Sequence, residues 1–143
     1  MQLLAERGFE HGEHEGLGFL PGEVRLLQPS DPQLRIPHIG WNSLKINDGS
    51  RLLAGFSGEP CFYFVHSYAF AARDPGCVAA TCDYGGEVVA VVERGHIFGT
   101  QFHPEKSHQA GLQLLRNFLA VSQPATVELP VLSGAAAAAE QAS

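Results

Sequence analysis

The sequence predicts an α/β fold, because a strand-like pattern fills most of the chain and a helical pattern comes after it. Short apolar runs broken by turn residues continue to about residue 102, which is typical of strands. From Ser107 the apolar residues recur at i, i+3 and i+7, as Leu112, Leu115 and Leu119 show, and this is the period of an amphipathic helix. The 143 residues, 45% of them hydrophobic, suit one globular domain.

The predicted elements succeed one another along the chain. Residues 1–5 predict a helix, and residues 17–46, in which Pro and Gly break short apolar runs, predict strands and turns. The dense apolar run at 61–70 predicts a strand buried on both faces. Three more strands are expected at 77–83, 87–93 and 96–102; short Gly-containing turns separate them and predict an antiparallel meander.

The two ends of the last helix are also predicted. Ser107 is the expected N-cap, since a serine side chain can accept a hydrogen bond from an N–H of the first turn. After residue 121 the periodicity is lost and the sequence ends in an alanine run. We therefore expect residues 122–143 to be a low-complexity, disordered tail.

Charge, hydropathy and cysteine content argue against several classes of protein. Nine Lys and Arg against fifteen Asp and Glu give a net charge of −6 without a basic run, so nucleic acid is not an expected partner. No stretch approaches 18 consecutive apolar residues, so no membrane segment is expected. The cysteines Cys61, Cys77 and Cys82 are odd in number and lack CxxC spacing, which favours a reducing cytoplasm over disulfides or a zinc site.

A His- and Glu-rich segment near the N-terminus raises the question of a metal site. His11, Glu13, His14 and Glu15 are close in sequence, and two histidines three residues apart could bind a metal ion only if the segment were helical. Gly12 and Gly16 favour a solvated loop instead. We therefore expect no metal site, and no cofactor.

The strongest chemical signal is His103-Pro104-Glu105, which directly follows a predicted strand. Strand ends are where α/β folds place their sites. Pro104 fixes its own φ, which holds the imidazole and the carboxylate in a defined relation. A histidine oriented by a carboxylate is the base of a nucleophilic triad, although a turn histidine beside a solvated glutamate would give the same three letters.

The residues around this motif resemble a known family. FGTQFHPEKS resembles the C-terminal signature of class I glutamine amidotransferases. Together with PHIGWNSL at 37–44 and FYFVHSYAF at 62–70, the segment at 98–119 is similar to the glutaminase subunits of imidazole glycerol phosphate synthases. The resemblance covers residues 1–121, and the HPE element by itself marks only the superfamily.

The resemblance implies a fold and an activity. Residues 1–121 would be the C-terminal part of an amidotransferase domain, with a mostly parallel sheet, helices on both faces and an antiparallel extension, the first strands being absent. The intact protein would hydrolyse glutamine to glutamate and ammonia through a cysteinyl thioester. As one half of a heterodimer it would pass the ammonia to a barrel-shaped cyclase subunit in histidine biosynthesis.

Residue roles are also implied by the resemblance. His103 would be the general acid and base, and Glu105 would orient it. Gln2 would contact the substrate glutamine, and the backbone of Ser67 and Tyr68 beside His66 would hold its amino-acid end. The face toward the cyclase would carry Trp41, Asn42, Tyr63 and Lys106. Each has a structural alternative: Gln2 as a solvated residue, residues 66–68 as a plain strand end, Trp41 as an ordinary buried side chain and Lys106 as a surface charge.

The nucleophile is the part of the triad that the chain lacks. In the family it lies in a G-x-C-x-G-x-Q stretch, and the opening MQLLAERG resembles the residues after the second glycine of that stretch, so we expect the cysteine two positions before Met1. Cys61, Cys77 and Cys82 lack flanking glycines, and Cys61 and Cys82 lie in predicted apolar strands where cysteine is commonly buried. We therefore expect the chain to be inactive alone. The alternative is a non-catalytic relative that acts as a binding or regulatory module, but the retained His103, Glu105, Gln2 and Lys106 argue against it.

Overall fold

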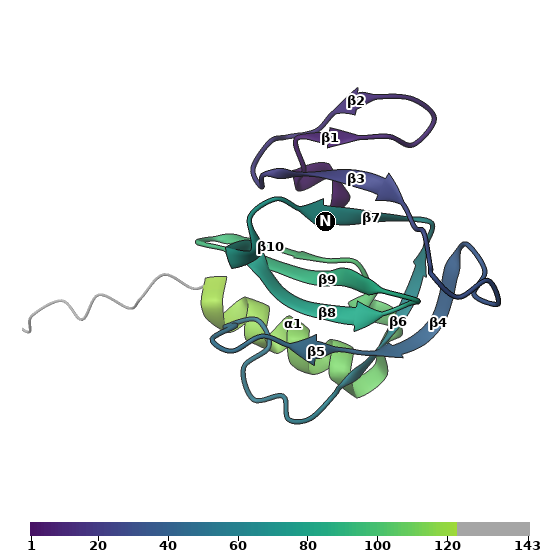
Figure 1. Cartoon of the computed structure of the whole chain (residues 1–143). Coiled ribbons are helices and arrows are strands. Elements are labelled where there is room, and N and C mark those ends of the chain that lie inside the picture. Colours follow the sequence, from purple (N-terminus) through teal and green to yellow (C-terminus); the bar gives the residue numbers. More distant parts are fainter. Residues whose placement is uncertain (123–143) are drawn as a thin grey trace, which may run out of the picture.

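The computed structural model describes residues 1–122, whose strands form two four-stranded sheets and a two-stranded ribbon (Figure 1). One sheet has the order β2 (His14–Glu15), β1 (Arg7–Gly8), β3 (Gly22–Leu26) and β7 (Tyr68–Ala72). The other has the order β10 (Ile97–Thr100), β9 (Glu87–Arg94), β8 (Val78–Asp83) and β5 (Lys45–Ile46), while β4 (His38–Ser43) pairs with β6 (Cys61–His66). The helices are η1 (Gln2–Leu4), η2 (Pro75–Cys77), η3 (Pro104–Lys106) and α1 (His108–Ser122).

The predicted α/β class is confirmed, because mixed sheets occur together with an amphipathic helix. Within residues 1–122 every strand pairing is antiparallel except that of β1 with β3, and α1 is the only α-helix. The β8–β9–β10 meander forms as predicted, since Gly85, Gly86 and Gly95 adopt the positive φ that its tight turns require. The described residues therefore contain the antiparallel part of the expected architecture and only one parallel pair.

Two predicted elements differ from the observed ones. Residues 1–5 form a single 3₁₀ turn, η1, and not a longer helix. The predicted single strand at 61–70 is divided at Ser67 into β6 and β7, which belong to different sheets. The expectation that it is buried on both faces is wrong for β6, where Phe62, Phe64 and His66 are buried and the alternate residues are not. The outward side chains of β6, those of Cys61, Tyr63 and Val65, are exposed or partly exposed.

Strand β9 separates two cores. On one side, Val91 belongs to the larger cluster, which contains Phe62 and Phe64 from β6 and Leu114 from α1. On the other side, Val92 packs in a smaller cluster with residues of η1, β3 and β7. Because β9 contacts a core on each side, it is apolar almost throughout. Strand β6 and helix α1 lie on the side of the larger cluster, and both contact η3.

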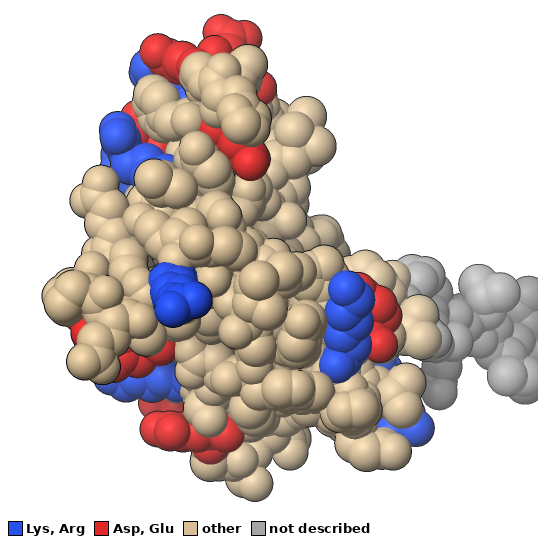
Figure 2. Space-filling model, turned by 90° about the vertical axis from the view of Figure 1, so that its right-hand side faces the viewer, with Lys and Arg blue, Asp and Glu red and all other residues tan. Residues whose placement is uncertain are grey.

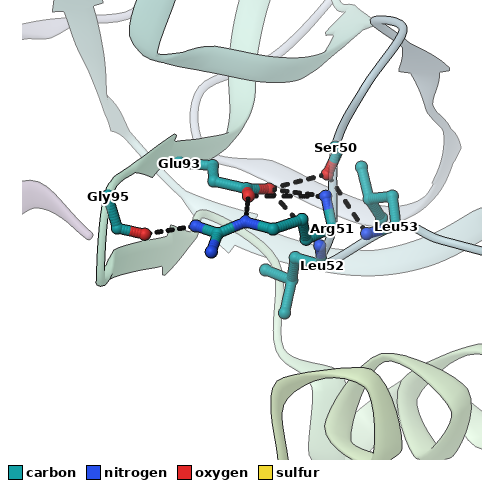
Figure 3. Close-up of polar contacts among 6 residues, drawn as sticks. All are labelled: Ser50, Arg51, Leu52, Leu53, Glu93 and Gly95. Carbon is teal, nitrogen blue, oxygen red and sulfur yellow. Dashed lines mark hydrogen bonds and ion pairs between the residues drawn. The ribbon is translucent and has the colours of Figure 1, made fainter. Parts of the chain in front are cut away.

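Hydrogen bonds from β9 and from α1 hold the loop between β5 and β6. The Glu93 carboxylate of β9 accepts hydrogen bonds from the Arg51 side chain at 2.7 Å, from the Ser50 hydroxyl at 3.0 Å and from backbone N–H groups of Arg51 and Leu52 (Figure 3). The Arg51 guanidinium also donates to the Gly95 carbonyl. From α1, the Asn117 amide donates to the carbonyl of Leu52 at 2.9 Å.

Helix α1 and the turn η3 are in direct backbone contact. A Cβ atom added at Gly111 would lie 1.8 Å from the carbonyl oxygen of Pro104, which is far inside van der Waals contact. The Gly111 N–H also donates to the Ser107 carbonyl at 3.0 Å. Glycine is therefore required at position 111 if η3 is to rest on the helix.

We expect Glu93→Gln to lower the free energy of unfolding by about 1–3 kcal/mol, because charge-assisted hydrogen bonds to a mostly buried side chain are lost. Burial opposes ionisation, but the hydrogen bonds from Arg51, Leu52 and Ser50 outweigh it and lower the pKa of Glu93. A lowered folded-state pKa stabilises the protein above the unfolded-state pKa, and this contribution is lost as the pH falls through the folded-state pKa. Urea unfolding at pH 7 and at acidic pH measures both effects. Glu87→Gln, at an exposed position on the same strand, is the control.

We expect Gly111→Ala to destabilise the chain by at least about 1–3 kcal/mol, the usual range for overpacking, because the new methyl group would displace the Pro104 carbonyl. Thermal unfolding measures the loss. Gln109→Ala, at an exposed position two residues earlier in α1, should change the melting temperature little. Equal stability of the two variants would contradict the close contact of α1 with η3.

Candidate functional site

The His103 and Glu105 side chains meet where the chain leaves β10 and enters η3. The His103 Nδ1 atom lies 2.9 Å from Oε1 of Glu105. The intervening Pro104 occupies the first position of η3, and this single tight turn brings the flanking side chains to the same side. The carboxylate therefore meets the imidazole as the His-Pro-Glu spacing predicts.

The charge on Glu105 determines which nitrogen of His103 carries the proton. The carboxyl is 62% exposed, and a hydrogen bond from its own backbone N–H lowers its pKa; desolvation opposes this, and the hydrogen bond from His103 adds to the lowering. An ionised carboxylate can only accept, so Nδ1 carries a proton and Nε2 keeps a free lone pair in the neutral ring. Within residues 1–122 no hydrogen bond reaches Nε2. The ring is thus set up as a base.

The backbone of the turn is held rigidly against β6. The His103 N–H donates to the Tyr63 carbonyl at 2.9 Å. The Ser107 hydroxyl, which is buried, donates to the His103 carbonyl at 2.6 Å and accepts from the Tyr63 N–H at 3.0 Å. Ser107 does directly precede α1, but the bonds of its hydroxyl join η3 to β6, which differs from the predicted N-cap role.

Gln2 and Tyr68, which lie 66 residues apart in sequence, are joined directly. The Gln2 Nε2 atom donates to the Tyr68 carbonyl at 2.7 Å and to the Gln101 side-chain oxygen at 3.3 Å. The His66 Nδ1 atom is 2.9 Å from the same Tyr68 carbonyl. The structure therefore brings together Gln2, His66 and Tyr68, and between the last two lies Ser67, whose carbonyl accepts from the Leu27 N–H at 2.9 Å.

A buried histidine that the sequence reasoning did not single out extends this group. His38 Nδ1 lies 2.9 Å from His66 Nε2, and the two residues face each other across the β4–β6 pair. Burial, with a smaller contribution from the proximity of His66, lowers the pKa of His38 from its usual 6.5 to about 4. Burial also lowers the pKa of His66 despite the opposing bond to Tyr68, and the proximity of His103 adds a smaller lowering. His38 is the second residue of PHIGWN and the first of β4, and the inward period-2 pattern that it shares with His66 was the signal that could have revealed it.

The expected partner-facing residues divide between the two faces of the β4–β6 ribbon. On the outer face, Trp41 is 47% exposed, contacts Tyr63 edge-on and stacks in parallel on His108 at 5.0 Å. Lys106 Nζ lies 5.9 Å from the centre of the Tyr63 ring. Asn42 is not part of this group, because neighbouring residues in a strand point to opposite faces and its amide donates inward to the Asp83 carbonyl at 2.8 Å.

The outer face of this ribbon, which we call the β4–β6 face, is apolar as well as exposed. Figure 2 looks onto the side of the molecule that carries β4, where the charged side chains gather mainly toward the upper and lower ends and wide areas between them carry no Lys, Arg, Asp or Glu. Ile39 and Val65 stand next to the aromatic pair and are 58% and 38% exposed. An exposed group of large apolar side chains of this kind is typical of an interaction surface.

The three cysteines do not offer a reactive thiol. Burial raises the pKa of Cys82 to about 12 and also raises that of Cys77, whose Sγ donates to the Asp74 carbonyl at 3.1 Å. A thiol with a raised pKa is a poor nucleophile near pH 7. The expectation that Cys61 is buried is wrong, because it lies on the outward side of β6, and it has no flanking glycine.

The His- and Glu-rich segment near the N-terminus forms the β1–β2 hairpin. Glu13 pairs with Arg7 at 2.9 Å, both side chains being exposed. Residues 1–122 contain no cluster of three or more side chains that could hold a metal ion. Nor does this part of the chain contain a helix long and apolar enough to cross a membrane.

Comparison with known proteins agrees with this geometry. Residues 1–121 match the family model described as glutamine amidotransferase class-I. Among curated proteins, the imidazole glycerol phosphate synthase subunit HisH of Azospirillum brasilense is 55% identical over 119 residues, covering 83% of this chain and 62% of the relative. The HisH subunit of Rhodospirillum rubrum is 52% identical over 120 residues, covering 83% of this chain and 56% of the relative.

A solved structure supports the fold. A candidate GMP synthase subunit from Thermoplasma acidophilum superposes with a TM-score of 0.55 at 22% identity, over 70% of this chain and 48% of that protein. The chain spans about 60% of the length of the first curated relatives that it matches. With a family match over 121 of its 143 residues and a His–Glu pair in hydrogen-bond contact, the chain belongs to the class I glutamine amidotransferases.

Proposed function

We propose that this chain is the larger part of a glutaminase subunit of imidazole glycerol phosphate synthase, an enzyme of histidine biosynthesis. The observation that carries the proposal is the 2.9 Å contact between His103 Nδ1 and Glu105, in a chain that is 55% identical to a HisH subunit. The reaction is the hydrolysis of glutamine to glutamate and ammonia, and no cofactor takes part in it.

The chemistry is set by the single free nitrogen of His103. Nε2 takes the proton of a cysteine thiol, and the thiolate attacks the side-chain amide carbon of glutamine. The same nitrogen then protonates the leaving ammonia, which leaves a thioester. Water, deprotonated by Nε2, hydrolyses the thioester to glutamate and the free thiol. Glu105 holds the Nδ1 proton and stabilises the imidazolium in each step.

The thiol in this scheme is not Cys61, Cys77 or Cys82. Cys77 and Cys82 are buried and their pKa values are raised. Cys61 is exposed but has neither the flanking glycines of a strained turn nor a hydrogen bond to His103. The nucleophile has to come from outside these 143 residues.

Glutamine binding is assigned to Gln2 and to the Ser67–Tyr68 segment. A carbonyl oxygen has two lone pairs, and those of Tyr68 are taken up by Gln2 and His66. The Gln2 amide donates to Tyr68 and Gln101, so its Oε1 is the atom left to accept from the substrate. The Tyr68 carbonyl therefore positions Gln2, and we assign glutamine to Gln2 Oε1 and to the backbone of the Ser67–Tyr68 segment.

The partner is the cyclase subunit of the synthase, bound as a heterodimer on the β4–β6 face. This face brings together Trp41, Tyr63 and Lys106, close to the N-terminal end of η3. Aromatic side chains on a largely uncharged surface are the typical centre of a protein interface. Docking at this position would place the partner next to the site where ammonia is released. Asn42 would support the face from within, through its bond to the Asp83 carbonyl.

The cellular setting that we propose is the cytoplasm. Cys61, Cys77 and Cys82 are all free thiols in the structure, Cys61 being exposed. Free exposed thiols suit a reducing compartment.

A non-catalytic binding module is the competing function. Such a module would need the β4–β6 face but not an oriented imidazole. The rigid attachment of His103 to Tyr63 and Ser107 therefore favours the glutaminase.

A fusion tests the catalytic roles. The part of the Azospirillum brasilense subunit that precedes its match to this chain is joined ahead of Met1, and glutamate release is assayed with the cyclase subunit present. We expect turnover, a loss of at least about 100-fold in kcat for His103→Ala because the base is removed, and a smaller loss for Glu105→Gln because the orienting charge is removed.

The controls separate the enzyme from the binding module. The 143-residue chain assayed in parallel should give no glutamate, and Cys→Ala changes at 61, 77 and 82 should leave the fusion active. Turnover by the chain itself that disappears with one of these changes would refute the assignment of the nucleophile. A fusion that folds and binds the cyclase but never releases glutamate would support the binding module.

The β4–β6 face makes a separate prediction about affinity. We expect Trp41→Ala to weaken binding of the fusion to the cyclase subunit by at least about tenfold, since a half-exposed aromatic residue at an interface centre commonly contributes more than about 1 kcal/mol. Lys106→Ala should have a smaller effect that shrinks with added salt. Surface plasmon resonance measures both, and Glu10→Ala on the β1–β2 hairpin is the control. Unchanged affinity of the Trp41 variant would place the interface elsewhere.

A further inference from the structure

His38 and His66 form a buried imidazole pair that the proposed chemistry does not use. Their exposed fractions are 2% and 7%. His38 stacks on Tyr84 with ring centres 3.9 Å apart and on Phe64 with ring centres 4.7 Å apart, so aromatic rings hold its plane. Buried polar groups are costly unless they are hydrogen-bonded, and within the described residues both imidazoles of this pair have hydrogen-bond partners.

The hydrogen bonds can run in only one direction. The Tyr68 carbonyl accepts but cannot donate, so His66 Nδ1 must carry the proton. In the neutral ring His66 Nε2 is then an acceptor, and His38 Nδ1 must carry the proton that joins the rings at 2.9 Å. This leaves His38 Nε2 as an acceptor, and it faces the Asn42 amide nitrogen at 3.4 Å.

Asn42 fixes the start of this chain of hydrogen bonds. Its Nδ2 donates to the Asp83 carbonyl at 2.8 Å, and its Oδ1 accepts from the Ser43 N–H at 2.8 Å. Turning the amide over would break both bonds. Asn42 therefore presents a donor to His38, and a proton on His38 Nε2 would face another donor. The lowered pKa values of both histidines agree with two neutral rings.

The far end of the chain of hydrogen bonds is the carbonyl that also holds Gln2. The Tyr68 oxygen accepts from His66 and, at 2.7 Å, from Gln2 Nε2. If His66 moved its proton to Nε2, its bare Nδ1 would face the carbonyl lone pairs. The repulsion would displace the Ser67–Tyr68 segment and with it the amide of Gln2.

We infer that His38 is a positioning residue for the glutamine site, which acts by holding the proton of His66 on Nδ1 and so fixing the Tyr68 carbonyl and Gln2. The inference rests on the proposed function for the identity of the ligand. The proton arrangement itself rests only on the geometry of Asn42, His38, His66 and Tyr68.

Two substitutions at position 38 separate the hydrogen bond from the packing. His38→Phe keeps an aromatic ring against Tyr84 and Phe64 but removes the donor to His66. His38→Asn removes the ring but keeps an N–H donor at the place of Nδ1. Long-range ¹H–¹⁵N NMR on the 143-residue chain reports which nitrogen of His66 is protonated. Glutamine titration and steady-state kinetics on the fusion report the KM for glutamine and kcat.

The expected results differ between the two variants. In the unsubstituted chain His66 is the Nδ1–H tautomer. His38→Phe shifts it toward Nε2–H and raises the glutamine KM roughly three- to tenfold, the range of one hydrogen bond, with kcat changed less than about twofold. His38→Asn keeps the Nδ1–H tautomer and a KM close to that of the unsubstituted fusion.

Three results would overturn the inference: an Nε2–H tautomer of His66 in the unsubstituted chain, no change in KM with His38→Phe, or equal losses in both variants, which would show a packing role alone. The NMR result requires no substitution, so it holds even if a variant does not fold. If the unsubstituted fusion neither binds nor hydrolyses glutamine, the proposed function fails, whereas the tautomer of His66 in the His38→Phe chain still decides whether His38 holds the proton on Nδ1.

Discussion

The backbone of Tyr63 is the point on which the candidate site depends. Its carbonyl accepts from the His103 N–H and its N–H donates to the Ser107 hydroxyl, so one residue of β6 holds both ends of η3. The Ser107 hydroxyl closes the arrangement through its bond to the His103 carbonyl. With the backbone fixed on both sides of Pro104, the imidazole and the carboxylate stay in contact although both are partly exposed. Exposed ion pairs are ordinarily weak, so the fixed backbone, rather than the ion pair itself, keeps the His103 and Glu105 side chains in contact.

The same strand connects the turn to the rest of the molecule. The inward side of β6 places Phe62 and Phe64 in the core and His66 at its end, while the outward side carries Tyr63 and Val65. One strand therefore supports the His103–Glu105 pair and carries one residue of the buried imidazole pair and part of the β4–β6 face. On the other side of η3, helix α1 contacts the Pro104 carbonyl at Gly111, where only a glycine leaves enough room. A displacement of β6 would therefore move all of these groups together.

The histidines of the site have opposite electrostatic settings. His103 stands at the surface beside a carboxylate whose lowered pKa keeps it ionised. His38 and His66 lie in the interior, with neutral partners, and burial lowers their pKa values. A partly exposed imidazole paired with an ionised carboxylate thus lies near two buried, neutral rings. In the proposed mechanism, this separation would let His103 transfer protons without changing the hydrogen bonds that hold Gln2.

The sequence by itself determined the α/β class, the β8–β9–β10 meander, the helix after Ser107 and the His103–Glu105 contact, because each depends on neighbours in the chain: a repeat of apolar residues, a glycine at a turn, or a proline between two side chains. Only the tertiary structure decided the division of residues 61–70 into two sheets, the exposure of Cys61 and the inward direction of Asn42. It also decided the joining of Gln2 to Tyr68 and of His38 to His66. These features depend on which strands pair and on what covers each face, and contacts between residues far apart in sequence fix both.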